Sequence, residues 1–310
     1  MAAFLDSELY QSTILGKNGG IGLALDEGLA STTETLSVFY GERLPWFVAV
    51  KAHGPTGHGS RFIPNTAVEQ LVDLCNKALA FRTGQRELLH ASPQHENCSH
   101  AVAAKKEKYP NGDTAMTNGD SNKKAKRTLG DVTSLNITSL EAGVRAGNKI
   151  AYNCVPPVAQ CSLDIRISPH TDPLEIGNML DMWCQECTID KSAPMEWSYL
   201  GRGHDGKKHA LTSTDGQQNK WYNVFAETLS NNGYQIEPQV FPAATDSRFL
   251  RALGIRAFGF SPMRSTKTVP CEILLHENNE CIPEATFLEG IDIYIQLLRV
   301  LASQGKEIEE

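Results

Sequence analysis

The segment 160–168 limits the possible folds of this chain more than any other part of the sequence. Apolar and polar side chains alternate along it without interruption, as in a β-strand with one buried face and one solvated face. Its apolar side chains are Cys161, Leu163, Ile165 and Ile167. Such a strand needs neighbouring strands and a layer over its apolar face, so the sequence around it must form a packed sheet domain.

The segments on either side of this strand predict the rest of that domain. Strands are predicted at 44–52, 132–140 and 195–200, which are rich in β-branched and aromatic residues. One helix is predicted to begin at a capping box of Thr66 and Glu69, and a second to begin near Asp172, with Pro173 in its first turn. The order strand, helix, strand, strand, helix, strand is typical of a small ferredoxin-like domain.

A second group of elements surrounds this domain. Strands are predicted at 36–40, 236–241 and 255–261, a helix at 221–229, and a last helix at about 285–301. The last helix carries an apolar face made of Phe287, Leu288, Ile291, Ile295 and Leu298. Residues 1–42 are too few to fold alone. We therefore predict an α/β fold in which a ferredoxin-like domain, 43–200, is inserted between two segments of a larger domain, 1–42 and 201–310.

Composition argues against several classes of function. The 310 residues carry a formal net charge of -7, which gives no reason to expect a nucleic-acid partner. No apolar run approaches the roughly 20 residues of a membrane helix, and the N-terminus lacks the basic region of a secretory signal. The scattered cysteines are typical of reduced, cytoplasmic thiols. The polar segment at about 95–128, with seven Lys or Arg and three Asp or Glu at 105–127, is predicted to be a disordered surface insertion.

Two candidate metal ligands follow apolar segments. Glu27 ends the motif Leu-Asp-Glu at 25–27, just before a glycine, and His276 follows the apolar run 273–275. Side chains at strand ends lie where α/β sheets bind ligands. Two ligands do not make a catalytic zinc site, which takes three protein ligands and a water. From the residues alone, a surface turn at Glu27 and a structural role for His276 stay open.

Candidate substrate-binding residues lie in three further segments. The segment 243–251 places Thr245, Arg248 and Arg251 after a strand, and arginine suits bidentate binding of a carboxylate. A helix start with exposed arginines is the alternative. His58 lies on a glycine-rich loop after a strand, and Asn153 precedes the strand whose polar face carries Arg166; each of these signals is weak alone.

Taken in order, the motifs resemble one family. They are Leu-Asp-Glu-Gly, Gly-His-Gly-Ser-Arg-Phe, Asn-Cys-Val-Pro-Pro, Asp-Ile-Arg-Ile-Ser-Pro, Pro-Ala-Ala-Thr-Asp-Ser-Arg-Phe, Gly-Phe-Ser-Pro-Met and Leu-Leu-His-Glu. Together they resemble the zinc metallopeptidase family of aminoacylases, carboxypeptidases and acetylornithine deacetylases, over nearly the whole chain outside the basic insertion. The resemblance is closest to the cytosolic N-acyl-amino-acid amidohydrolases.

The resemblance implies a fold, a reaction and an assembly. The larger domain would be a zinc-exopeptidase-like α/β catalytic domain, and the insertion would be a lid that also forms a cytoplasmic homodimer. The reaction would be hydrolysis of N-acyl-L-amino acids by water that two zinc ions activate. Glu27 and His276 would be zinc ligands. His58 would reach the partner subunit's active site and hydrogen-bond the developing oxyanion.

The resemblance also implies the residues that hold the substrate. Asn153 and Arg166 of the inserted domain would help to position it. Thr245 and Arg251 would bind its free α-carboxylate, with Arg248 as a weaker candidate.

The chain also departs from the family pattern. The family has an upstream zinc-binding histidine, a bridging aspartate and a Glu-Glu pair that supplies the catalytic base. Residues 1–21 offer Asp6 and Glu8 but no histidine and no such pair. We therefore expect an N-terminally truncated chain with impaired activity, and loss of the family function is the alternative. A non-catalytic dimerisation or regulatory fragment, and a carboxypeptidase or dipeptidase of the same family, also stay open.

Overall fold

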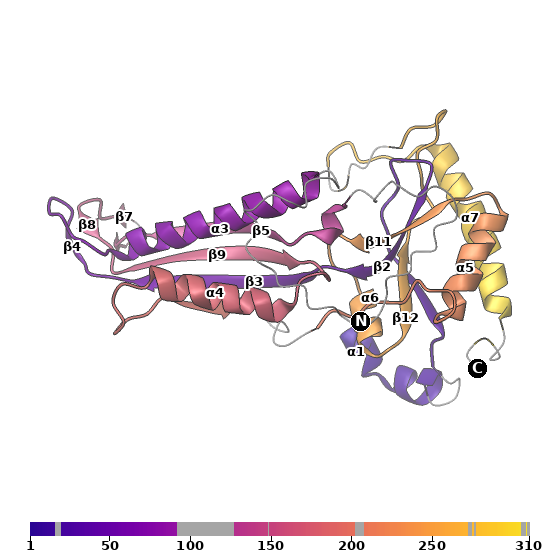
Figure 1. The fold of residues 1–310 in the computed structure, drawn as a ribbon, viewed down its shortest axis with the longest axis horizontal. Helices are drawn as coiled ribbons and strands as arrows, with labels where there is room; N and C mark the ends of the chain where they lie inside the picture. The colour runs from indigo at the N-terminus through magenta and orange to yellow at the C-terminus, as the bar shows by residue number, and fades with distance from the viewer. Residues whose placement is uncertain are drawn as a thin grey trace.

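Two sheets with their own helices form the molecule, which is elongated (Figure 1). The structure is a computed structural model that describes residues 1–15, 20–91, 127–147, 149–201, 208–271, 275, 277–304 and 308. Most of the basic insertion predicted at 95–128, and His276, lie outside these residues. No helix of the described ranges combines the length and hydropathy that a bilayer crossing requires.

The inserted sheet is antiparallel and has the order β10-β3-β9-β5. Its strands are β3 (Leu44–His53), β5 (Ser134–Ala142), β9 (Val158–Ile167) and β10 (Glu196–Tyr199). The central strand β9 pairs with β3 over its whole length, from Val158 opposite His53 to Ile167 opposite Leu44. Its four alternating apolar side chains are at most 1% exposed, which confirms the alternation predicted at 160–168.

Helices α3 (Ala67–His90) and α4 (Pro173–Cys187) cover one face of this sheet, as Figure 1 shows. The capping box of Thr66 and Glu69 is present at the start of α3, and Asp172 caps α4. With the strands taken in chain order, the sheet order is fourth, first, third, second, and the helices follow the first and third strands. This arrangement confirms the predicted ferredoxin-like pattern.

The second sheet combines both ends of the chain in the order β1-β12-β2-β11. Its strands are β1 (Leu23–Asp26), β2 (Leu36–Glu42), β11 (Ile236–Phe241) and β12 (Arg256–Phe260). β1 is parallel to β12 and β2 is parallel to β11, whereas β12 and β2 are antiparallel. Segments more than 200 residues apart in sequence therefore share one sheet, as the α/β prediction required.

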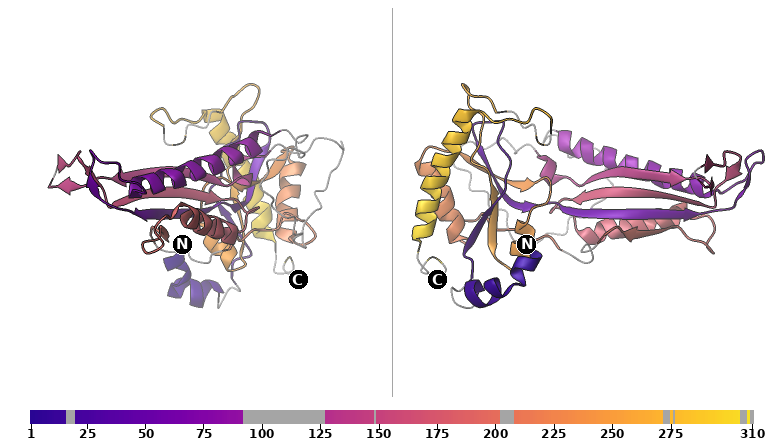
Figure 2. Two further views of the ribbon diagram at one scale, coloured as in Figure 1. Left: turned by 60° about the vertical axis from the view of Figure 1, so that its left-hand side comes forward. Right: turned by 180° about the vertical axis from the view of Figure 1, so that it is seen from behind.

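Helices cover both faces of the second sheet. On the outer face, α5 (Lys220–Asn231) and α7 (Glu284–Ser303) pack against buried side chains such as Phe258 and Phe260. On the face toward the inserted sheet lie α6 (Ser247–Ala252), α1 (Ala2–Leu5) and the π-helical segment η1 (Leu9–Leu15) (Figures 1 and 2). α6 brings the segment 243–251 onto the sheet.

The apolar face predicted for the last helix is not the face that α7 buries. Phe287, Leu288, Ile291, Ile295 and Leu298 are all 42–52% exposed, whereas the side chains toward the sheet are Thr286, Gly290, Ile293, Leu297 and Leu301. Helix α7 carries apolar side chains on its exposed side as well as on its buried side, so periodicity alone does not identify the buried side.

Arg43 connects the two sheets at the point where β2 passes into β3. Its side chain is only 5% exposed. Nε donates to Pro242 O at 2.7 Å after β11, and Nη1 donates to Ser134 Oγ at 2.9 Å in the inserted sheet. Burial lowers the pKa of Arg43 to about 10. The junction is therefore held by a buried cation whose partners are neutral oxygens from both sides.

Two short ribbons form the far end of the inserted domain. β4 (Gly57–His58) pairs with β8 (Cys154–Val155), and β6 (Arg145–Ala146) pairs with β7 (Lys149–Ile150). Figure 1 and the rear view in Figure 2 both place the β4–β8 ribbon at the end of the molecule opposite α5 and α7.

Candidate functional site

The end of β1 is joined to the start of α6 by Asp26. Its Oδ2 accepts hydrogen bonds from the backbone N–H of Ser247 at 2.7 Å and from the Ser247 hydroxyl at 2.8 Å. Its Oδ1 accepts from the backbone N–H of Glu27 at 2.8 Å. Partial burial would raise the pKa of Asp26, but these hydrogen bonds outweigh burial and hold it below its usual value. Asp26 is therefore a charged anchor between the two motifs.

Arg251 and Glu42 form a buried ion pair beneath the segment 243–251. Arg251 is 6% exposed, and its Nη1 donates to Glu42 Oε1 at 3.0 Å. Its Nη2 donates to Phe39 O at 3.2 Å and its Nε to Ala257 O at 3.0 Å. Internal acceptors therefore already bind all three nitrogens of this guanidinium. Arg251 fixes α6 to the sheet.

Thr245 is also directed at Glu42. Its backbone N–H donates to Glu42 Oε2, and its hydroxyl lies 3.4 Å from Glu42 Oε1. Burial raises the pKa of Glu42, while the Thr245 N–H and the Arg251 charge oppose that rise. Burial likewise lowers the pKa of Arg251, and Glu42 opposes that shift. Glu42, at the end of β2, thus organises two of the predicted substrate-binding residues.

Arg248 is placed differently from Arg251. It is half-buried, and its guanidinium lies 4.8 Å from the centroid of the Phe249 ring. Among the described residues it has no hydrogen bond or ion pair, although its charge acts on the carboxylate of Glu42. Arg248 is therefore the arginine of this segment whose guanidinium meets no internal carboxylate in direct contact.

Glu27 extends past the strand and is exposed. The next residue, Gly28, lies directly against β12: a Cβ at this position would be 2.5 Å from the backbone N of Ser261, so a side chain cannot fit. The glycine of the Leu-Asp-Glu-Gly motif therefore lets β1 leave the sheet beside β12 and present Glu27 at the sheet edge.

The described residues do not by themselves provide a complete metal site. Across the described ranges there is no group of three or more His, Cys, Asp or Glu side chains that could hold a metal ion. Asp26, which is next to Glu27, uses both carboxylate oxygens for backbone and side-chain donors of Glu27 and Ser247. Glu27 alone does not match the three protein ligands of a catalytic zinc.

The β4–β8 ribbon brings His58 and Asn153 together. The register pairs His58 with Cys154, and the N–H of Gly59 donates to Asn153 O at 2.7 Å. The Asn153 amide nitrogen lies 3.4 Å from His58 Nε2. Both side chains are exposed, and the ribbon lies far from β1 and α6 (Figure 1). Within one chain, His58 and Asn153 thus form one polar group that is separate from Glu27.

Arg166 lies apart from both groups, on the polar face of β9. Its Nε and Nη2 donate to the two carboxylate oxygens of Asp164 at 2.6 and 3.0 Å, and its guanidinium lies 5.2 Å from the Phe47 ring centroid. The predicted catalytic and substrate-binding residues therefore fall into three groups. Thr245, Arg248 and Arg251 lie around Glu42, His58 and Asn153 lie at the β4–β8 ribbon, and Arg166 lies on β9.

Sequence reasoning missed the carboxylate that organises the site. Glu42 received no role, yet it binds both Thr245 and Arg251. A charged Glu-Arg pair directly after the apolar strand 36–40 was the available signal, because a charge there needs a buried partner or solvent. The role of Ser247 was also missed. It lies in the segment 243–251, in which substrate-binding roles were predicted only for Thr245 and the two arginines.

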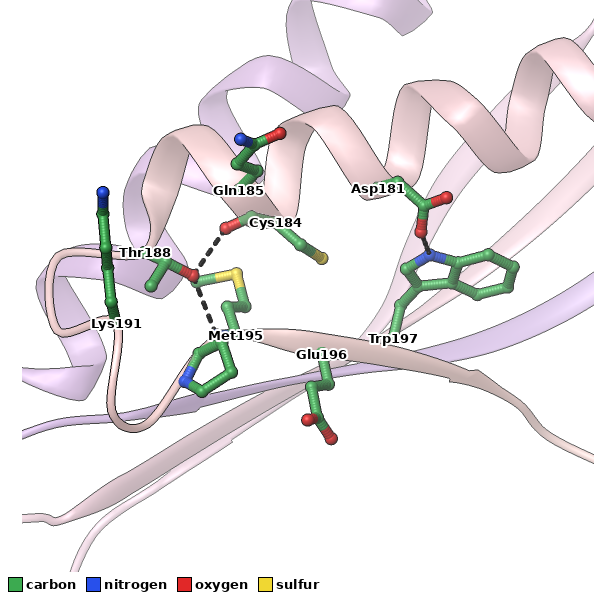
Figure 3. Close-up of a pocket in the computed structure, with 9 residues that line it drawn as sticks. Asp181, Cys184, Gln185, Thr188, Lys191, Met195, Glu196 and Trp197 are labelled. Atoms are coloured by element: carbon green, nitrogen blue, oxygen red, sulfur yellow. Dashed lines mark hydrogen bonds between the residues drawn. The ribbon is translucent and has the colours of Figure 1, made fainter.

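A groove of about 700 Å³ lies elsewhere, between the end of α4 and β10 (Figure 3). Asp181, Lys191, Glu196 and Trp197 line it, and the Trp197 indole donates to Asp181 Oδ1 at 2.7 Å. None of the predicted site residues lines this groove, so its position gives no support to the site described above.

Comparison with known sequences gives close relatives. The chain is 41% identical over 281 residues to aminoacylase-1 of Dictyostelium discoideum, which covers 90% of this chain and 58% of that protein. It is 36% identical over 282 residues to human aminoacylase-1, covering 91% of this chain and 57% of that protein. No model of a protein family matches.

The chain is similar to aminoacylase-1 over about nine tenths of its own length. The chain spans a little under three fifths of the length of the relatives it matches. Among solved structures, a yeast dipeptidase, Dug1p, aligns with a TM-score of 0.56 at 15% identity, covering 97% of this chain and 63% of that one. The M20-family carboxypeptidase Sso-CP2 of Sulfolobus solfataricus aligns with a TM-score of 0.54 at 18% identity, covering 96% and 67%. These structural matches show the M20 peptidase fold.

Proposed function

We propose that this chain acts in the hydrolysis of N-acyl-L-amino acids to a carboxylate and a free L-amino acid. The observation that carries the proposal is the pair of hydrogen bonds from Ser247 to Asp26, at 2.7 and 2.8 Å. They hold the segment 243–251, with its arginines, beside the end of the strand that presents Glu27. A group that binds the substrate carboxylate and a group suited to a metal ligand are thereby kept at one sheet edge.

The proposed binding of the substrate's α-carboxylate involves Thr245, Arg248 and Arg251. To bind the substrate carboxylate, Arg251 has to release Glu42, its present partner at 3.0 Å. Arg248 has no hydrogen-bonded carboxylate to displace among the described residues, so it makes the first contact at lower cost. Until Arg251 releases Glu42, the Glu42–Arg251 pair holds α6 against the sheet.

Glu27 and His276 are the proposed zinc ligands of this chain. Zinc supplies water that is nucleophilic near neutral pH. The described residues do not complete such a site, and we assign no step of the reaction to the metal. We propose that the isolated chain is therefore impaired in turnover, with the substrate-binding half of the site present.

The remaining proposed roles belong to the inserted domain, 43–200, which lies between catalytic segments 1–42 and 201–310. The β4–β8 ribbon, which carries His58 and directly follows Asn153, lies at the end of the molecule opposite α5 and α7 (Figure 1), whereas Glu27 follows β1 in the other sheet. We propose a cytoplasmic homodimer formed through the inserted domain, in which the His58 and Asn153 side chains reach the partner's substrate. An oxyanion donor at this position would lower the activation barrier by roughly 3–4 kcal/mol. Arg166, closer to the junction, would help to hold the substrate after it releases the carboxylate of Asp164.

A binding experiment tests the substrate class without requiring turnover. Calorimetric titration with N-acetyl-L-methionine is compared with its carboxamide, which lacks the α-carboxylate. The proposal expects the carboxamide to bind at least about tenfold more weakly, since a hydrogen bond to a charged group contributes about 1.5–3 kcal/mol. Equal affinity for the two compounds would refute carboxylate recognition.

Two alternatives have their own outcomes. A dipeptide with a free amino group, such as glycyl-L-methionine, binding more tightly than N-acetyl-L-methionine favours a carboxypeptidase or dipeptidase. A dimer by light scattering, at twice the 34.0 kDa chain mass, that binds neither ligand favours a non-catalytic dimerisation fragment. That second alternative has a specific observation behind it, because the inserted sheet is complete while the described residues do not complete a metal site.

A further inference from the structure

The turn that follows β4 surrounds one nitrogen of the His58 ring. The chain reverses over 58–61, with the N–H of Arg61 donating to His58 O at 3.1 Å. This reversal brings the backbone N–H of Ser60 to 3.2 Å from His58 Nδ1 and the Ser60 hydroxyl to 2.8 Å from the same nitrogen. Two groups of one residue therefore meet the same ring atom.

The backbone contact determines where the ring carries its hydrogen. A peptide N–H can only donate, so Nδ1 must offer its lone pair to Ser60. In the neutral ring, one nitrogen is the donor and the other the acceptor, and the hydrogen is then on Nε2. The Ser60 hydroxyl, which can donate or accept, donates to Nδ1 as well.

We propose that Ser60 is a positioning residue that holds His58 in its Nε2–H tautomer, so that the ring presents an N–H donor from the tip of the inserted domain. The inference rests on the proposed role of His58 as a donor to the substrate oxyanion. The Nδ1–H tautomer would turn a lone pair toward that negative charge and repel it.

The neighbouring amide is consistent with this tautomer once its orientation is considered. The Asn153 nitrogen lies 3.4 Å from Nε2, and two N–H donors cannot bond to each other. The oxygen and nitrogen of an amide are interchangeable by a half-turn, whereas the peptide N–H of Ser60 is not. Asn153 therefore turns its oxygen to Nε2 and accepts from it until a substrate oxygen takes that hydrogen bond.

Nitrogen NMR of the histidine rings tests the proposal directly. The chain is labelled with ¹⁵N-histidine and studied in mildly alkaline buffer, and the His58 signals are assigned from their loss in His58→Asn. In the wild type we expect the Nδ1 shift of an unprotonated nitrogen and the Nε2 shift of a protonated one. A wild-type ring with hydrogen on Nδ1 would overturn the proposal.

Substitutions of Ser60 separate the tautomer effect from general structure. Ser60→Ala keeps the peptide N–H and loses only the hydroxyl, which can bond to either tautomer, so we expect the wild-type shifts. Ser60→Pro removes the peptide N–H, and we expect about a fivefold rise in the Nδ1–H population, as for the loss of one hydrogen bond. Ser60→Thr retains both donors and should keep the wild-type shifts. Thr56→Ala is the matched control: its hydroxyl lies on the same ribbon but donates to Val155 O at 2.6 Å, away from the ring.

The outcomes are distinct from those of the proposed function. Unchanged His58 shifts in Ser60→Pro refute the positioning role of Ser60, whatever the chain binds or hydrolyses. Ser60 is exposed, so its substitution should preserve the fold, which unchanged His53 signals verify. Failure of the N-acetyl-L-methionine titration, with the tautomer as expected, instead rejects the proposed substrate.

Discussion

Ser247 donates two hydrogen bonds to Asp26 Oδ2, although the two residues lie 221 positions apart in sequence. Ser247 is fully buried, whereas Asp26 is partly buried. The contact ties the first strand of the chain to the helix that follows β11, and it couples the ends of the chain through one side chain.

Ser247→Ala should lower the free energy of unfolding by about 1–2 kcal/mol, because it removes one of these donors to a charged acceptor while the backbone N–H remains. Urea unfolding measures the change. Ser303→Ala is the control, because its hydroxyl is exposed and donates to a neutral backbone oxygen, Val300 O, instead of a carboxylate. We expect that control to stay within about 0.5 kcal/mol of wild type. Equal effects of the two substitutions would contradict the anchoring role of Asp26.

Arg251→Leu should destabilise the fold by roughly 3–5 kcal/mol, because it leaves Glu42 as a buried charge without its cation. Arg248→Leu should cost less than about 1 kcal/mol, since Arg248 is only half-buried. Thermal and urea unfolding of the two variants give the comparison.

The same pair of variants separates structure from binding. If Arg248 binds the substrate carboxylate, Arg248→Leu folds normally and its affinity for N-acetyl-L-methionine falls at least about tenfold. Unchanged affinity in Arg248→Leu would remove this arginine from the proposed substrate site.

The protonation of Asp131 should make the free energy of unfolding depend on pH in the acidic range. Burial raises its pKa, but hydrogen bonds from His170 and Thr128 outweigh burial and lower it below the ordinary value of 3.8. A carboxylate with a depressed folded-state pKa contributes stability above its unfolded pKa and loses that contribution as pH falls through the folded pKa. The stability difference between wild type and Asp131→Asn should therefore be constant at neutral pH and shrink below about pH 4. A difference that grows on acidification would contradict this.

Thiol reactivity should follow exposure along the described chain. Cys154 and Cys281 are exposed, whereas Cys161, Cys184 and Cys187 are buried. Brief treatment of the native protein with iodoacetamide should label the two exposed thiols first, and peptide mass spectrometry identifies them. Fast labelling of Cys161 would show that the core beneath α3 opens readily.

Zinc content tests the metal assignment. We expect well below one tightly bound zinc per chain after dialysis, because the described ranges hold no group of three possible ligands and catalytic zinc takes three. Inductively coupled plasma analysis gives the ratio, and Glu27→Gln should lower any residual binding further. Two zinc ions per chain would refute both the incomplete site and the impaired turnover inferred from it.

Much of the secondary structure could be predicted from interactions between residues that are close in sequence. The alternation along β9, the Thr66–Glu69 capping box and the Asp172 cap depend on neighbours in sequence, and each is present as predicted. The side that α7 buries depends instead on where the sheet lies. With apolar side chains on both sides of the helix, no local signal could decide between Ile291 and Ile293.

The site could be anticipated as a set of motifs but not as a network. Glu42 and Arg251 are 209 positions apart, and Asp26 and Ser247 are 221 apart. Such pairings follow from the sheet order β1-β12-β2-β11, in which neighbours in space are remote in sequence. That order is a property of the whole chain, so the partner of Arg251 had no signature in the segment 243–251.

The buried junction at Arg43 has a mechanical consequence. β3 starts beside Arg43 and runs for ten residues toward the tip, a lever arm of about 33 Å at roughly 3.3 Å per residue. A swing of only about 5° at the junction would move the far end of this arm by about 3 Å, which is the length of one hydrogen bond. A small rotation at the junction therefore produces a larger displacement of His58. The hydrogen bonds of Arg43 to Pro242 and Ser134 limit that rotation and so limit the displacement.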